Sequence, residues 1–152
     1  MVLDILDDYA NDEPTAFKAT SDYLDIVKLL AKEKMFAALS VKVSTLGFTF
    51  DKDACLLNLL SIAKEASLRG IGFEIDMEGR ATVDFTLDAA RAVVETQYPV
   101  TVALQAYLDR TAKDIESMVK NGIRVRLVKG AYAGDAQDFE DIPGRFKNLM
   151  RA

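Results

Sequence analysis

The sequence contains no histidine and a single cysteine, Cys55. A Ser-His-Asp or Cys-His mechanism needs an imidazole, so both are excluded. One thiol permits no internal disulfide, and no histidine–cysteine cluster is available for zinc. We therefore expect no metal site, and any acid–base chemistry must come from carboxylates, lysines, tyrosines or a cofactor. Cys55 opens an amphipathic segment, and we interpret it as a packing residue.

Long apolar runs and an excess of positive charge are also missing. No apolar run approaches the roughly 20 residues of a membrane span. The acidic N-terminus lacks the basic and then apolar pattern of a secretory signal. A formal net charge of −5 disfavours nucleic acid as an electrostatic partner. We expect a cytoplasmic protein, with peripheral association at the inner membrane as an alternative.

What the chain does contain is an alternation of short β-branched runs with segments of helical periodicity. The five runs that we predict as strands are residues 2–6, 39–43, 71–77, 100–107 and 125–129. Between them, apolar residues recur at helical spacing. With 152 residues, half of them hydrophobic, the chain suits one domain. The order of elements predicts an α/β protein with a parallel sheet, either a barrel or an open sheet.

The side chains within the predicted strands favour the barrel. A strand of an open sheet is buried on both faces and should be apolar throughout. In residues 71–77, however, Phe73 and Ile75 alternate with Glu74 and Asp76. One apolar and one polar face is typical of a (β/α)8 barrel, whose chemistry gathers at the carboxyl ends of the strands. We predict a partial TIM-barrel-like domain over residues 1–152, with about five of the eight parallel strands and flanking helices.

Two polar residues near strand ends form the first part of a candidate site. Lys42 is costly to bury without a partner, and Asp76 on the adjacent strand could supply one. We predict a Lys42–Asp76 pair that binds a carboxylate or stabilises a developing charge. The alternative is that Asp76 and the nearby Glu78 are solvated carboxylates at a strand end.

The next two strands supply the second part of the candidate site. Gln105 can donate and accept hydrogen bonds, as recognition of a heteroaromatic ring requires; the alternative is a buried amide satisfied by backbone. Arg126 and Lys129 have opposite parity, and we predict that Arg126 points inward. Lys129 then lies at the strand end, where Gly130 and Ala131 let a ligand approach the main chain.

Four motifs at these strand ends resemble those of the flavin-dependent proline dehydrogenases. They are SVKVSTLG (residues 40–47), IDME (75–78), LQAYL (104–108) and RLVKGAY (126–132), in the family's order. The segment VLDIL near the N-terminus resembles the family's first barrel strand, but less closely than the four motifs do. The resemblance covers nearly the whole chain and about the first five-eighths of the family's barrel.

The resemblance implies FAD as cofactor, L-proline as substrate, Δ1-pyrroline-5-carboxylate as product and a quinone as electron acceptor. On the substrate side, Lys42 would contact the proline carboxylate, with Asp76 beside it. The positions that would meet the flavin are Met77, Gln105, Arg126, Lys129, Gly130 and Ala131. Asp76 and Arg126 would be the catalytic residues, with Arg126 near the reactive nitrogen of the ring.

The chain departs from the family's pattern in two places. Gly79 and Arg80 follow IDME where the family often has a more acidic or serine-containing continuation, and the last barrel helix, which clamps proline, has no counterpart. We therefore expect weak FAD binding, little or no turnover, and self-association through the open barrel edge. Two alternatives remain: a Schiff-base lyase or aldolase that uses Lys42 or Lys129 as nucleophile, and a non-catalytic half-barrel that serves binding or assembly.

Overall fold

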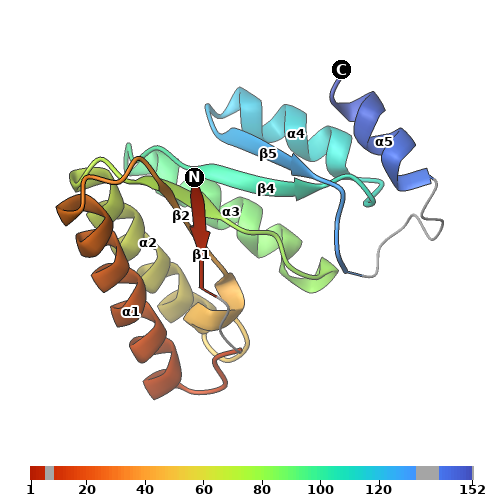
Figure 1. The fold of residues 1–152 in the computed structure, drawn as a ribbon. Coiled ribbons are helices and arrows are strands. Elements are labelled where there is room, and N and C mark those ends of the chain that lie inside the picture. The colour runs from red at the N-terminus through yellow and green to blue at the C-terminus, as the bar shows by residue number, and fades with distance from the viewer. Residues whose placement is uncertain (6–8, 133–140, 152) are drawn as a thin grey trace.

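The protein folds as one five-stranded parallel sheet whose strands follow chain order, β1-β2-β3-β4-β5 (Figure 1). A computed structural model describes residues 1–5, 9–132 and 141–151. The strands are β1 (Val2–Asp4), β2 (Ala38–Val41), β3 (Gly72–Ile75), β4 (Thr101–Gln105) and β5 (Arg124–Val128). The helices are α1 (Glu13–Lys32), α2 (Lys52–Leu68), α3 (Val83–Glu95), α4 (Thr111–Lys120) and α5 (Asp141–Leu149), with short 3-10 helices η1 (Val43–Leu46) and η2 (Arg80–Thr82). The α/β fold with five parallel strands and flanking helices is therefore confirmed.

The predicted strands are in the right places, but their ends are wrong. The run predicted over residues 71–77 is a strand only over Gly72–Ile75, and Asp76 and Met77 belong to the loop that follows it. Likewise Lys42 follows β2 and precedes η1. The last residue of the first predicted strand, residue 6, lies outside the described residues. Lys42, Asp76 and Met77 consequently lie on loops that begin where the strands stop, whereas Gln105 and Arg126 lie within β4 and β5.

The apolar face of the sheet packs against the helices and forms the core. In the register of β2 and β3, Leu39 lies opposite Phe73 and Val41 opposite Ile75, and all four are buried. Helix α2 contacts β3, α3 contacts β4, and α4 contacts both β4 and β5. The predicted alternation of apolar and polar residues is thus confirmed, and we call the polar side the inner face of the sheet.

Aspartate residues fix the start of the two longest helices. The Asp12 side chain accepts a hydrogen bond from the Thr15 N–H at 2.9 Å before α1. Asp51 accepts from the N–H groups of Asp53 and Ala54 at 3.0 and 2.9 Å before α2. These caps satisfy backbone donors that the first helical turn leaves without partners.

The sheet is open at both edges within the described part of the chain, since β1 pairs with β2 alone and β5 with β4 alone. Near the β1 edge, Met1, Val2 and Phe36 are exposed, and Phe36 is 99% exposed. They line a cavity of about 470 Å³ at the amino ends of the strands. Exposed edges and apolar side chains of this kind are available for association.

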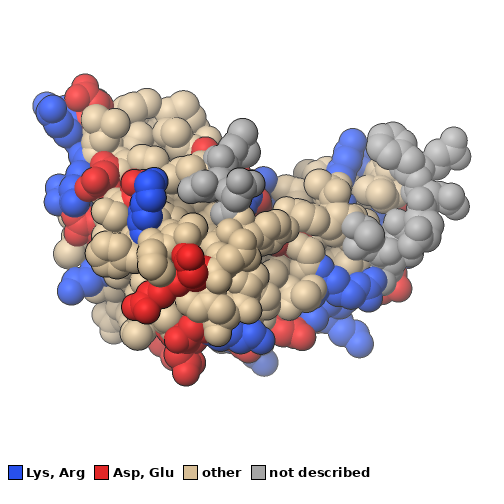
Figure 2. All heavy atoms as spheres, turned by 90° about the horizontal axis from the view of Figure 1, so that it is seen from below, with Lys and Arg blue, Asp and Glu red and all other residues tan. Residues whose placement is uncertain are grey.

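Charges of both signs are mixed on the face of the molecule that Figure 2 shows. In the view of Figure 2, Lys and Arg side chains are interspersed with Asp and Glu and gather in no single-sign patch on the visible face. Among the described residues, no helix combines the length and the apolar character needed to cross a membrane.

Candidate active site

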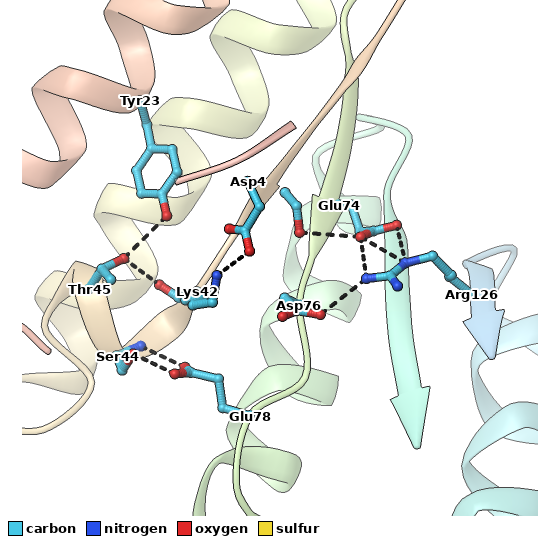
Figure 3. Close-up of polar contacts among 10 residues, drawn as sticks. Asp4, Tyr23, Lys42, Ser44, Thr45, Glu74, Asp76, Glu78 and Arg126 are labelled. Atoms are coloured by element: carbon cyan, nitrogen blue, oxygen red, sulfur yellow. Dashed lines mark hydrogen bonds and ion pairs between the residues drawn. The ribbon is translucent and has the colours of Figure 1, made fainter. Parts of the chain in front are cut away.

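Arg126 reaches across the inner face from β5 to two carboxylates of the third strand and its following loop (Figure 3). Its Nε donates to both oxygens of Glu74 at 3.0 and 2.9 Å, and its Nη2 lies 2.7 Å from Glu74 Oε1. Nη2 also donates to Asp76 Oδ1 at 3.1 Å. The inward orientation predicted for Arg126 is confirmed. The hydrogen bond to Glu74 is the largest cause that raises the pKa of Arg126 above its ordinary value.

Lys42 forms its ion pair with Asp4, not with Asp76 (Figure 3). The predicted Lys42–Asp76 pair is therefore wrong. The physical reason is that β2 has two neighbours: β1 offers Asp4 to Lys42 on one side, while Arg126 engages Asp76 from the other. Two clusters of charged side chains thus lie along the inner face. One is the Lys42–Asp4 ion pair, and the other is Arg126 with its two carboxylates.

The Lys42 pairing also bears on the Schiff-base alternative. A Schiff-base nucleophile must present an amine lone pair to a carbonyl substrate. Lys42 Nζ instead donates to the Asp4 carboxylate. The geometry around Lys42 gives that alternative no support.

Glu78 is turned away from these groups and anchors the loop after β3. It is 2% exposed. The Ser44 N–H donates to it at 2.9 Å and the Ser44 hydroxyl at 2.5 Å. The interpretation of Glu78 as a solvated carboxylate is wrong, because this pair joins the loop to η1 and provides the carboxylate with buried donors.

Gln105, the last residue of β4, has a side chain that is only half satisfied. Its Nε2 donates to the Met77 carbonyl oxygen at 2.9 Å. Its buried Oε1 has no hydrogen-bond partner among the described residues. A backbone carbonyl therefore satisfies the Nε2 donor, in line with the alternative that Gln105 is a buried amide paired with backbone. The Oε1 acceptor, however, is left available. Since an unpaired buried acceptor is costly, this oxygen is suited to a ligand that brings an N–H.

Gln105 opens onto a cavity of about 530 Å³ at the carboxyl ends of β4 and β5. The residues that line it are Asp76, Met77, Gln105, Leu127, Val128, Lys129, Gly130, Ala131, Tyr132 and Phe146. Five of the six positions predicted to meet a flavin are therefore brought together, namely Met77, Gln105, Lys129, Gly130 and Ala131. The sixth, Arg126, immediately precedes Leu127, whereas Lys42 lies outside this lining.

Only glycine fits at position 130, because of its backbone conformation and the side chain packed against it. Its φ is +112°, and a Cβ at this position would lie 1.5 Å from Cδ1 of Tyr107. We expected the missing side chain to let a ligand approach the main chain, but the Tyr107 ring fills that space. Gly130 thus permits the tyrosine to pack and the chain to turn into the cavity.

Two residues of the inner face were not among the predicted site residues. Glu74 holds Arg126, and Asp4 holds Lys42. The signal for Glu74 was its parity, since it alternates with Phe73 and Ile75 as Asp76 does. Asp4 is paired in register with Ser40, which in turn lies opposite Glu74, so all three share the polar face.

Comparison with known proteins identifies the family of the chain. The family model described as proline dehydrogenase matches residues 1–138. Proline dehydrogenase 2 of Bacillus subtilis is 28% identical over 155 aligned residues, which cover 99% of this chain and 51% of that protein. The proline dehydrogenase of Deinococcus radiodurans is 27% identical, over 97% of this chain and 51% of that protein. The chain spans about half the length of the curated relatives it matches.

Solved structures share the fold. Proline utilization A from Corynebacterium freiburgense matches with a TM-score of 0.77 and 17% identity, covering 98% of this chain and 19% of that protein. Proline utilization A from Bdellovibrio bacteriovorus matches with a TM-score of 0.75 and 24% identity, covering 86% of this chain and 17% of that protein. With the family match over most of its length, the chain belongs to the proline dehydrogenase family.

Proposed function

We propose that residues 1–152 form a partial proline dehydrogenase barrel domain that contributes one wall of a site for FAD and L-proline. The reaction would be the oxidation of L-proline to Δ1-pyrroline-5-carboxylate. Membership in the family supports proline as substrate. The observation that carries the proposal is the buried Gln105 Oε1, which lacks a partner among the described residues at the cavity formed by the family-like motifs.

The residues around the cavity fit a flavin. Gln105 Oε1 would accept from an N–H of the ring, and the Met77 carbonyl keeps the side-chain amide in that orientation. Lys129 would supply a cation for a phosphate or another anionic part of the cofactor. When bound, FAD would supply the two-electron acceptor, and the protein would supply orientation and electrostatics.

The charged groups of the inner face suit the substrate. Lys42 would bind the proline carboxylate, sharing its ammonium group with Asp4. Asp76 would lie beside the substrate, held by Arg126, which the family resemblance would place near the reactive nitrogen of the flavin ring. The oxidation would remove a hydride equivalent from the proline ring carbon next to nitrogen, with FAD as its acceptor, and would release a proton from the proline nitrogen, so that a C=N bond forms in the product. Asp76 and Arg126 are our candidates for the catalytic residues because they are charged and inward-facing.

The remaining parts of the proposal concern partners and location. We propose a quinone as the final electron acceptor and a cytoplasmic location, with contact at the inner membrane as the alternative. The two open strand edges support self-association. We expect this chain on its own to bind FAD weakly and to turn over proline poorly or not at all.

An absorbance titration of the chain with FAD tests the proposal, followed by anaerobic addition of L-proline. We expect a perturbed flavin spectrum, and slow bleaching by proline at most. The Lys129→Gln variant should weaken binding, whereas the exposed Lys64→Gln, with the same change of charge, should not. A spectrum identical to that of free FAD would contradict the proposal and favour a non-catalytic module. Robust proline-dependent dye reduction would contradict the expected weak activity.

A further inference from the structure

Glu74 is a buried carboxylate that the proposed reaction does not use. It lies within β3 and is 2% exposed. The Ser40 hydroxyl donates to its Oε1 at 3.2 Å, and Nε of Arg126 faces both of its oxygens. A carboxylate at this depth is costly without such partners, and an arginine that meets both oxygens fixes direction as well as charge.

The path of Arg126 to Glu74 crosses a whole strand. Arg126 belongs to β5, Glu74 to β3, and β4 runs between them. The residue of β4 that pairs with Arg126 is Ala103, which is fully buried. Because Glu74 lies opposite Thr101, the register continues to place Asp76 at the level of Ala103. A larger side chain at position 103 would stand between the guanidinium and both carboxylates.

We propose that Glu74 is a positioning residue that holds the guanidinium of Arg126 across β4 beside Asp76, with Ala103 as the gap that this requires. The importance of this positioning for catalysis rests on the proposed function, in which Arg126 lies near the flavin. The hold itself depends only on this chain. Glu74 contacts both Nε and Nη2, and Asp76 accepts from Nη2 as well, so two carboxylates hold the guanidinium.

Nuclear magnetic resonance of the arginine Nε–H groups tests the hold in the chain itself. The Arg126 signal is assigned by its loss in Arg126→Lys. In Glu74→Gln, which keeps the volume but removes the charge, hydrogen exchange at this Nε–H should accelerate about tenfold or more, as expected for loss of a charge-assisted hydrogen bond. Ala103→Leu should accelerate it too, although it leaves Glu74 unchanged. Unchanged exchange in Glu74→Gln would overturn the proposal.

A matched control removes an ion pair of the same kind from the surface. Glu65 accepts from Nε of Arg69 at 2.6 Å on α2, and Glu65→Gln should leave the Arg126 signal as it is. Glu74→Asp keeps the charge on a shorter side chain, so it should restore part of the protection. If Glu74→Gln does not fold, as judged by a far-ultraviolet circular dichroism spectrum that differs from that of the parent, Glu74→Asp and Ala103→Leu test the proposal instead. Slow exchange of the Arg126 Nε–H at the parent rate in both variants would overturn it.

FAD titration of the same variants separates this proposal from the proposed function. If Arg126 is positioned for the flavin, Glu74→Gln should weaken FAD binding by a factor similar to Arg126→Gln, and Glu74→Asp should recover part of it. Equal FAD affinity of Glu74→Gln and the parent would overturn the proposal that Glu74 positions Arg126 for the flavin. Absence of FAD binding by the parent would contradict the proposed function alone, since the exchange measurement still decides whether Glu74 holds Arg126.

Discussion

Replacing Gly130 by alanine should be the most damaging of three glycine substitutions that separate crowding from backbone strain. At Gly130 a Cβ would lie 1.5 Å from Cδ1 of Tyr107, and φ is +112°. The positive φ costs about 1–3 kcal/mol for a residue other than glycine, and the displaced ring adds about 1–3 kcal/mol of overpacking. We expect Gly130→Ala to lower the free energy of unfolding by about 3 kcal/mol or more.

Two other glycines provide the controls. Gly70 has a φ of +69°, and a Cβ added there would meet no atom within 4 Å, so Gly70→Ala reports strain alone, about 1 kcal/mol. Gly79 has a φ of −66° and equally open space, so Gly79→Ala should be neutral or slightly stabilising. Urea unfolding followed by circular dichroism gives the three values. Equal midpoints for Gly130→Ala and Gly70→Ala would refute the role assigned to the Tyr107 ring.

Three further predictions concern a helix cap, the buried thiol and association. Asp51→Ala should cost about 1 kcal/mol because α2 loses its cap, measured by urea unfolding against Asp25→Ala on the exposed side of α1. Burial raises the pKa of the Cys55 thiol from 9.0 to about 12, so the unfolded chain ionises first and stability should fall as pH rises from 9.0 to about 12. Cys55→Ala should remove about 1.4 kcal/mol per pH unit of that fall, and identical pH slopes would contradict it. Light scattering should detect self-association that Phe36→Ser weakens, whereas a monomer at all concentrations would contradict the open-edge argument.

The fold could be predicted because the alternation of apolar and polar residues can be recognised within each short segment of the sequence. Phe73 and Ile75 alternate with Glu74 and Asp76, and this alternation alone identifies which face the helices cover. The third strand was predicted too long because the same alternation continues through Asp76 and Met77, beyond Ile75, the last residue of β3. Periodicity reports which way side chains point, but it carries little information on where pairing ends.

The partners of the charged groups were harder to predict than their positions. Parity within one strand showed that Arg126 and Lys129 could not both point inward, and we predicted Arg126 as the inward residue. Whether Lys42 pairs with Asp4 or with Asp76 depends on distances among three strands. Parity within a single strand contains no information on these distances. The unpaired Gln105 Oε1 and the Tyr107 ring over Gly130 likewise arise from contacts between segments far apart in the chain.

The side-chain amide of Gln105 offers the most direct test of the proposed flavin site. Its Nε2–H2 signals can be followed by nuclear magnetic resonance while FAD is added, with the Asn58 amide of α2, which donates to the Leu46 carbonyl at 3.0 Å, as internal control. We predict that the Gln105 signals shift with FAD concentration while those of Asn58 stay in place. Gln105 signals that do not move, or shifts of equal size at Asn58, would contradict a flavin site at the carboxyl end of this sheet.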